Sequence, residues 1–562
     1  MPQNAKDLQL RELKDTISEL NRVIESLNKA VEESNAREKE ALEKCSSLEE
    51  QLDVLKKRFF GSKSEKHTRF DDFPGQLVLV FNEAESSADP VLLKEEEQAV
   101  SGQDQSCRSA SEKSRRPRAH KQDFTEKYKG LAVHKVYLDG DDPRLCSVCG
   151  TPMEQIGEEL VRREIDYIPA RVTIKEIWSR SWKCPKCSKE GADFEIPHIE
   201  KDRDGHFHMI HGMCSGSTLA WVIYQKYFNH IPLYRQESDW KQLGASISRT
   251  TMANWIVSNS DEFFTPMFDY FRRVLLARHF VMADETPVQV LKEEGRRPQS
   301  KSYMWVFRSG EDGGPPVILY KYSPTRAGDN AKDFLDGFEG YIMTDGYSGY
   351  NKLKKAKRTS CWFHVRRYVV EAIPKGKEND LSEPAVQAVA YIQKLAALEK
   401  EIHSRYTSKD HEKIKDERLR REKRILESFW SWLDRQTAVR GSRMEKALIY
   451  INRRREYLTN YLEDGRCSFS NNAAERAIKP FVMGRKNWLF ADVPEGADAS
   501  AKCYTMIEMA KANGVNAYQY LRFLFEKGPS SSMSDAELEA LAPWNESVKE
   551  EINRRAIEAY VA

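Results

Sequence analysis

The chain has 562 residues, which is too long for one hydrophobic core, so we expect three or more domains. Its formal net charge at pH 7 is only +2, so any nucleic-acid binding has to rest on local basic patches. No apolar run reaches the roughly 18 residues of a transmembrane helix, and the N-terminus lacks the apolar core of a signal peptide. We therefore expect a cytoplasmic protein with no membrane partner.

Residues 8–60 carry a heptad pattern of apolar residues. The frame runs from Leu10 to Phe59 with alternating spacings of three and four, and its only polar members are Ser34 and Glu38. The intervening positions are rich in Glu, Lys and Arg, as the surface of a coiled coil requires. The pattern predicts a coiled coil that joins copies of the chain into a homo-oligomer. A single amphipathic helix packed on the body is the alternative.

Residues 82–122 have low complexity and are rich in Ser, Glu, Gln and Lys. The segment ends in a basic run from Lys113 to Lys121 that contains Pro117. We interpret it as a linker with a basic arm, which could lie along phosphate groups or in a minor groove. A solvated linker without a ligand explains the same composition equally well.

Residues 123–200 contain two CxxC pairs, separated by 34 residues that include a β-rich run. Each pair aims two thiolates at one point, and four thiolates complete a tetrahedral zinc site. Ten cysteines in a chain of this length are few, which favours metal binding over disulfides in a reducing cytosol. The pattern predicts a zinc-ribbon-like module with one structural zinc ion. Its four ligands are Cys146, Cys149, Cys184 and Cys187.

Residues 205–260 read as helical and contain a helix-turn-helix pattern. One helix is expected to end near Leu243, Gly244 supplies a turn, and Ser248 caps a second helix over 249–257. In a helix-turn-helix the second helix enters the major groove of double-stranded DNA. A short helical pair without any DNA contact is the alternative. The residues expected to read DNA are Arg249, Thr250, Thr251 and Asn254.

Three acidic residues occupy distinctive positions among the 87 of the chain. Asp284 lies in a strand within RHFVMADETPVQV, and Asp345 ends a short strand in GYIMTDGYSGY. Glu475 lies one turn into a helix that Asn471 or Asn472 is expected to cap. Their contexts, two strand ends and one helix start, make them candidates for a single site.

The segment between the first two acids predicts an ordered α/β core over 278–374. We expect strands at 302–308 and 317–322 and a helix at 328–337. Strand, strand, strand, helix, strand is the order of a ribonuclease H-like sheet. The first and fourth strands of such a sheet are neighbours, so their two acids would converge.

Converging carboxylates suit phosphodiester chemistry. Cleavage needs one oxygen activated as a nucleophile and another stabilised as it leaves, and two Mg²⁺ or Mn²⁺ ions about 4 Å apart can do both. We expect Asp284 to bridge two such ions, with Asp345 and Glu475 each holding one. The same three residues would thus be both catalytic residues and metal ligands.

Several long motifs appear in the order found in one known family. They are FGSKSEK, the two CxxC pairs, NHIPLYRQESDW, ADETPVQV, MTDGYSGY, CWFHVRRY, SNNAAERAIKPF, GRKNWLF and AKANGVNAYQYL. Over nearly the whole chain, the sequence resembles the insertion sequence 66 family of bacterial transposases. The resemblance implies a DDE-type transposase with a ribonuclease H-like core, whose acids map onto Asp284, Asp345 and Glu475.

The resemblance also implies a function. A transposase of this type binds the terminal inverted repeats of its element, cleaves DNA with metal ions and transfers the freed strand, in some cases with accessory proteins of the same element. Two alternatives stay open from the sequence. One is a non-catalytic DNA-binding relative, and the other is a metal-dependent nuclease without strand transfer.

Asp345 and Glu475 are 130 residues apart, more than a bare core of this type needs. The charged, helical segment 375–465 is therefore interpreted as an insertion, which the similar family also has. The last core helix is expected within 468–490, followed by a C-terminal region over 491–562. The whole is a multidomain α+β protein.

Other residues near the acids are candidates for supporting roles. Cys361 and His364 match a Cys-x-x-His signature of related transposases, and they either support the site or belong to the core. Trp488 either stacks on an unpaired base or fills the core. Basic and aromatic residues expected to contact DNA are Arg366, Arg367, Arg476, Lys479, Arg485, Lys486 and Trp488.

Overall fold

The computed structural model describes residues 210–561 and a few short pieces nearer the N-terminus. Those pieces are residues 19, 22, 25–29, 32–33, 172, 174, 181–183 and 199–201. Most of the predicted coiled coil, the linker and all four paired cysteines lie outside the described residues, so they stay predictions. Within the segment assigned to the zinc module, β1 (Ser181–Lys183) and β2 (Ile199–Lys201) pair as an antiparallel ladder.

The described residues form two compact units. One contains residues 268–512 and includes the larger sheet. The other contains residues 210–267 and 513–561 and is helical. The region predicted as helical at 205–260 thus groups with the C-terminal residues, whereas the segment predicted as an insertion at 375–465 groups with the sheet.

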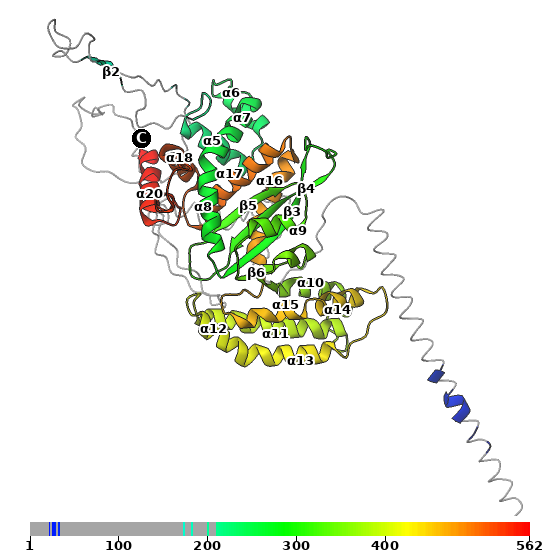
Figure 1. The fold of residues 1–562 in the computed structure, drawn as a ribbon. Helices are drawn as coiled ribbons and strands as arrows, with labels where there is room; N and C mark the ends of the chain where they lie inside the picture. The colour runs from blue at the N-terminus through cyan, green and yellow to red at the C-terminus, as the bar shows by residue number, and fades with distance from the viewer. Residues whose placement is uncertain are drawn as a thin grey trace, which may run out of the picture. The chain divides into compact units, whose positions relative to one another are not determined.

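A mixed sheet forms the centre of the first unit (Figure 1). Its strand order is β5-β4-β3-β6-β7, with β3–β4 and β4–β5 antiparallel and β3–β6 and β6–β7 parallel. The short β8 pairs with the far end of β3 in parallel. The strands are β3 (Phe280–Val290), β4 (Lys301–Ser309), β5 (Ile318–Ser323), β6 (Tyr341–Thr344), β7 (Lys357–Ser360) and β8 (Phe490–Ala491).

The elements expected between the first two acids are confirmed. Strands β4 and β5 cover the two predicted strands, and α9 (Gly328–Phe334) covers the predicted helix except for its last turn. Gly337 has a φ of +89°, a left-handed conformation that a helix cannot continue through, so the helix ends before it. The Phe334 ring of α9 stacks on Phe307 of β4 with a centroid distance of 4.2 Å.

Helix α17 (Pro494–Ala512) covers the free edge of β5. The main-chain N–H of Tyr320 donates to Thr505 Oγ1 at 3.0 Å, and that of Ile318 donates to Met509 Sδ at 3.0 Å. Side chains of α17 therefore take the place of a further strand. An edge covered in this way has no unpaired donors left at these two positions to template aggregation.

The segment predicted as an insertion is helical, and its helices lie together on the β6 side of the sheet (Figure 1). Helix α15 and the short η4 pack next to β7, the strand at that edge. The segment contains α11 (Pro384–Arg405), α12 (His411–Glu417), η3 (Arg418–Glu422), α13 (Lys423–Leu433), α14 (Arg443–Asn452), α15 (Arg455–Thr459) and η4 (Asn460–Glu463).

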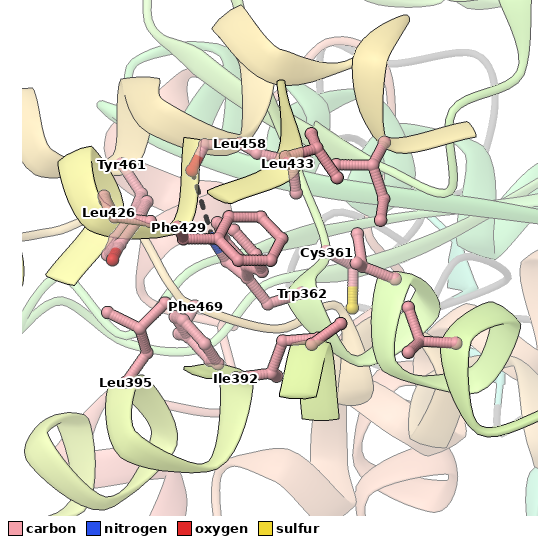
Figure 2. Close-up of a cluster of buried hydrophobic side chains, with 14 of the residues drawn as sticks. Cys361, Trp362, Ile392, Leu395, Leu426, Phe429, Leu433, Leu458, Tyr461 and Phe469 are labelled. Atoms are coloured by element: carbon pink, nitrogen blue, oxygen red, sulfur yellow. Dashed lines mark hydrogen bonds between the residues drawn. The ribbon is translucent and has the colours of Figure 1, made fainter. Parts of the chain in front are cut away.

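A buried hydrophobic cluster joins these helices to α10 (Trp362–Glu371), the helix that follows β7 (Figure 2). Trp362 is fully buried at its centre, and its indole N–H donates to the Leu458 carbonyl at 3.1 Å. Its ring stacks on Phe469 and meets the edge of Phe429. The inserted helices and the sheet unit consequently share one core.

The second unit contains seven helical segments among its described residues. Helix α5 packs against α18, where the Trp221 and Tyr224 rings meet the Tyr518 ring. The helices are α5 (Gly216–Tyr227), α6 (Leu233–Gln242), α7 (Arg249–Asn259), η1 (Ser260–Phe264), α18 (Ala517–Lys527), α19 (Asp535–Glu539) and α20 (Glu546–Val561). Helix α8 (Thr265–Leu276) leads from this unit to the sheet. The last helix has 16 residues.

The two helices and the turn that were predicted there are present as α6 and α7. Gly244 follows α6 with a φ of +85°, and the Ser248 side chain accepts the Thr251 N–H at the start of α7. Arg249 and Asn254 are exposed, whereas Trp255 and Ile256 are buried. Among the described residues, no helix combines the length and apolar composition that crossing a membrane requires.

Candidate active site

The pairing of β3 with β6 brings Asp284 level with Asp345. Met282 lies opposite Met343 in this parallel pair. Asp284 and Asp345 each come two residues later, so they are at matching positions. Neighbouring strands lie about 4.8 Å apart, so side chains at matching positions share one face. Strand β6 ends at Thr344, and the chain leaves the sheet at Asp345 while β3 continues.

The edge of β3 is open beside Asp284. Strand β6 pairs with 280–282 and β8 with 289–290, so no strand of the described residues covers this edge between them. Asn471 fills part of the opening, because its Nδ2 donates to the Ala283 carbonyl at 3.2 Å. Asp284, the residue after Ala283, therefore lies on the stretch of β3 between its pairings with β6 and β8.

Helix α16 (Asn472–Trp488) carries Glu475 in its first turn. Asn471 occupies the N-cap position, as expected, but its side chain makes no capping hydrogen bond. The prediction of a side-chain cap was wrong, because the Asn471 amide instead donates its hydrogen bond to the Ala283 carbonyl of β3. This contact links the start of the Glu475 helix to the strand of Asp284.

Cys361 connects the helices that carry His364 and Glu475. Its sulfur lies just before α10 and accepts the main-chain N–H of Asn471 at 3.1 Å. Burial raises the pKa of the Cys361 thiol to about 11, so it is neutral at pH 7. One sulfur thus ties together the starts of α10 and α16.

Two groups of α10 lie beside Glu475. His364 Nε2 is 3.6 Å from Glu475 Oε1, and Arg367 Nη2 is 3.9 Å from Glu475 Oε2. Burial lowers the pKa of His364, although the negative charge of Glu475 opposes the shift. His364 is therefore close to one acid of the predicted site.

A fourth acid, Glu285, was not predicted from the sequence. Its side chain is 1% exposed, and it accepts hydrogen bonds from Arg326 Nε at 2.8 Å and from the Tyr350 hydroxyl at 2.6 Å. Arg326 also lies 3.7 Å from Asp345 Oδ2 and stacks over the Tyr347 ring at 4.2 Å. The available signal was a charged residue next to Asp284 in an interior strand, which must find a partner.

The acids form a region of strong negative charge. Burial, followed by the charges of Glu285, Asp345 and Glu475, raises the pKa of Asp284 well above its ordinary value. Burial likewise raises the pKa of Glu285, against the hydrogen bonds from Tyr350 and Arg326. Gathering like charges in this way is unfavourable unless a cation neutralises them.

The donor set suits a hard divalent cation, because Mg²⁺ and Mn²⁺ prefer carboxylate oxygens. Within the part of the chain that the structure describes, no three His, Cys, Asp or Glu side chains are grouped closely enough to enclose one ion. Mg²⁺ is commonly held by one or two carboxylates, with waters and substrate phosphates as its other ligands. Pairs of these acids fit that pattern of ligands.

The residues expected to contact DNA fall into two groups. Arg476 and Lys479 are exposed on α16, and Arg367 is exposed on α10, all in the sheet unit near Glu475. Arg366 and Arg485 are partly buried, and Lys486 is exposed. Arg249 and Asn254 belong to the helical unit.

Trp488 lies at the end of α16 and is partly buried. Its ring sits against Gly484 one turn earlier, so closely that a side chain at Gly484 would collide with both Trp488 and Tyr504. This packing favours the core interpretation of Trp488 over the stacking one. Gly484 is required there because of the close approach, not because of its backbone angles.

One family model matches more than half of the 562 residues. It is described as the transposase IS66 family, and it matches residues 211–499, a range that contains Asp284, Asp345 and Glu475. The match defines the class of the protein as a transposase. More particularly, the chain belongs to the IS66 transposase family.

Two further models match N-terminal segments. A zinc-finger binding domain of transposase IS66 matches residues 143–188, which contain both CxxC pairs. A model described as transposase C of IS166 homeodomain matches residues 47–127. The latter range overlaps the end of the predicted coiled coil and the predicted linker, so this segment belongs to a module found in the family.

Three proteins of Sinorhizobium fredii (strain NBRC 101917 / NGR234) are similar over most of their length. Protein y4qI is 28% identical over 534 residues, which cover 91% of this chain and 90% of y4qI. Protein y4hP is 26% identical over 506 residues, 84% of each chain. Protein y4jD is 25% identical over 511 residues, 89% of this chain and 94% of y4jD. All three are named as uncharacterized, so they supply no residue roles.

Proposed function

We propose that this transposase binds the terminal inverted repeats of its element and catalyses metal-dependent strand cleavage and strand transfer through Asp284, Asp345 and Glu475. The observation that supports the proposal is the register of β3 and β6, together with Glu475 at the start of the helix that packs against β3. Asp284 and Asp345 follow the matched register of β3 and β6, and the charge of Glu475 acts on Asp284 from α16. A transposase acts on DNA, so the substrate is a phosphodiester.

The sheet supports a ribonuclease H-like core. The order β5-β4-β3-β6-β7, with β4 antiparallel to β3 and β5, has the first and fourth strands side by side as that fold requires. A helix carrying the third acid packs against β3. The family resemblance and the strand order therefore point to the same core.

The residues fit two divalent ions, which when bound would activate the attacking oxygen and stabilise the leaving one. Asp284 would hold both ions, and Asp345 and Glu475 would hold one each. Arg367, Arg476 and Lys479 lie near Glu475 and would hold the phosphates of the bound strand. Water attacks first and frees a 3′-hydroxyl, which then attacks the target phosphate.

The other parts of the chain have expected roles in assembly and recognition. The coiled coil would join subunits, a structural zinc ion would hold the four paired cysteines, and α7 would read the major groove. Cooperation with accessory proteins of the element and a cytoplasmic location also stay expectations.

The test uses the full-length chain with an oligonucleotide duplex that carries the element's end, a target plasmid and Mg²⁺ or Mn²⁺. We expect cleavage and joined products from the wild type and neither from Asp345→Asn. Asp336→Asn is the matched control, because Asp336 is an exposed acid of the same unit outside the site. Cleavage by Asp345→Asn at the wild-type rate would overturn the assignment.

The two alternatives give different products in the same assay. A metal-dependent nuclease would cleave the element's end but would join nothing to the plasmid, even when given an end with a free 3′-hydroxyl. A non-catalytic relative would bind the duplex and leave it intact. Joined products exclude both.

A further inference from the structure

The loop that follows β6 is fixed through three consecutive carbonyl groups. The Asp345 carbonyl accepts the Tyr450 hydroxyl at 2.8 Å, and the Gly346 carbonyl accepts Arg454 Nη2 at 2.8 Å. The Tyr347 carbonyl accepts Arg358 Nη2 at 3.3 Å. Carbonyls of a surface loop usually face water, so three side-chain donors in a row mark this loop as held in one conformation.

Two of the three donors come from the inserted helices. Tyr450 lies on α14, and Arg454 lies in the turn between α14 and α15. Both residues are more than 100 positions from the loop in sequence, with separations of 105 and 108. The insertion therefore contacts the loop of Asp345 directly, besides sharing the hydrophobic core shown in Figure 2.

The donors are themselves held rigidly. The Arg454 guanidinium lies over the Tyr450 ring at 3.7 Å, and this ring stacks on Tyr368 at 4.2 Å. Gly346 has a φ of +100°, and a side chain there would collide with the Arg454 guanidinium. Only glycine meets both conditions, so the close approach of Arg454 and the turn of the loop depend on each other.

The carboxylate of Asp345 is oriented by the same loop. Its Oδ1 accepts the Tyr347 N–H at 2.9 Å, within the loop that the three donors hold. Its Oδ2 lies toward Arg326, 3.7 Å from the guanidinium. A shift of the loop would therefore turn the carboxylate as a whole, because one of its oxygens is bonded to the main chain.

We propose that Tyr450 and Arg454, here called the insertion bracket, are positioning residues that hold Asp345 in the orientation needed to bind a divalent ion. This inference rests on the proposed function of Asp345. It gives the insertion a role in the active site that goes beyond lengthening the chain between the second and third acids. The bracket acts through the main-chain carbonyls of Asp345 and Gly346.

The experiment measures binding of Mn²⁺ to the full-length chain by calorimetry, together with cleavage as a function of Mn²⁺ concentration. Tyr450→Phe removes the hydroxyl and keeps the ring, and Arg454→Lys keeps the charge and removes the planar fork. Substituting groups that orient a metal ligand costs about 10-fold or more in metal affinity. We expect each variant to raise the Kd for Mn²⁺ by this factor and to regain much of its cleavage at high Mn²⁺.

Matched controls lie in the same inserted segment. Tyr391→Phe removes a hydroxyl from α11, and Arg453→Lys changes the exposed residue next to Arg454. Both should bind Mn²⁺ as the wild type does. Thermal unfolding of every variant checks that the fold is kept, and the conservative substitutions are chosen to keep it.

The outcomes separate the two proposals. A wild type that cleaves, with bracket variants whose Kd for Mn²⁺ is unchanged, overturns the bracket and leaves the proposed function standing. Mn²⁺ binding that depends on the bracket in a chain that never cleaves supports the bracket and overturns the proposed function. Equal losses of Mn²⁺ affinity in the bracket variants and the two controls also overturn the bracket, because any substitution in the insertion would then weaken binding.

Discussion

At the scale of single residues, Cys361 holds together the two helix starts beside Glu475. It is the residue just before α10, and its buried sulfur accepts the main-chain N–H of Asn471, just before α16. Asn471 in turn donates to the carbonyl next to Asp284. Cys361 is therefore linked through Asn471 to the main chain beside Asp284. His364 is nearer to the acids, because its Nε2 lies 3.6 Å from Glu475 Oε1.

This role predicts an unequal cost for two similar substitutions. Cys361→Ala leaves the buried Asn471 N–H without an acceptor, which costs about 1–3 kcal/mol beyond the lost packing. Cys467→Ala removes an equally buried sulfur of the same cluster for which no such bond is seen. Urea unfolding should show the larger loss for Cys361→Ala. Equal losses would show that the sulfur is only a packing group.

Some acids near the site can be predicted from the sequence, and others cannot. Asp284 and Asp345 could be predicted because each follows a short apolar run, which is visible locally, although β3 continues past Asp284 to Val290 instead of ending there. Glu285 could not, because its partners Arg326 and Tyr350 lie 41 and 65 positions away. Its role appears only when the sheet brings β3 close to the loops after β5 and β6.

At the scale of elements, the inserted helices contain a buried ionic network. Arg418 of η3 is fully buried and makes two hydrogen bonds to Glu399 of α11, at 2.6 and 2.8 Å. Glu422, also fully buried, accepts the Tyr461 hydroxyl at 2.6 Å. Burial, and then the nearby charge of Glu399, raises the pKa of Glu422 to about 9, so Glu422 is the protonated member of the pair at pH 7.

The raised pKa predicts a pH-dependent stability. Between the ordinary glutamate pKa and about 9, folded Glu422 keeps a proton that the unfolded chain releases, so stability falls as the pH rises. Glu422→Gln removes this slope and should become more stable relative to the wild type by about 1 kcal/mol or more from pH 6 to pH 9. Chemical unfolding at several pH values measures the difference. Glu427→Gln, at an exposed position of α13, should show no such trend.

The proposed role of α7 in reading DNA leads to a prediction about DNA affinity. Arg249 is exposed at its start and should contact the element's end, so Arg249→Ala should weaken binding by about 1–3 kcal/mol. Lys241→Ala, at an exposed position of α6, serves as the control. Fluorescence anisotropy with the element's end and with an unrelated duplex reports the change. Equal affinity of Arg249→Ala and the wild type for the element's end would remove α7 from recognition.

At the scale of the whole molecule, the order of elements was largely predictable, whereas their contacts were not. The strands, α9 and the inserted helices follow from local periodicity and length. The covering of β5 by α17 did not follow, since Thr505 and Met509 look like ordinary members of an apolar helix. The joining of 210–267 with the C-terminal residues is likewise a long-range effect.

The zinc module gives a test that does not depend on activity. In the proposed site, four thiolates would hold one zinc ion, so the purified chain should contain about one zinc per subunit. Cys184→Ser should lose it, because three ligands bind far more weakly than four. Cys107→Ser is the control, since Cys107 is a single cysteine outside the pairs. Zinc retained at full occupancy by Cys184→Ser would contradict the four-cysteine site.

The central claim is that the carboxylate of Asp345 is a metal ligand in DNA cleavage. Its most direct test is Asp345→Cys, assayed for cleavage of the element's end in Mg²⁺ and in Mn²⁺, each relative to the wild type in the same metal. A thiolate binds Mn²⁺ better than the harder Mg²⁺, so the loss should be smaller in Mn²⁺ by about 10-fold or more. The same relative loss in both metals would contradict direct coordination by Asp345.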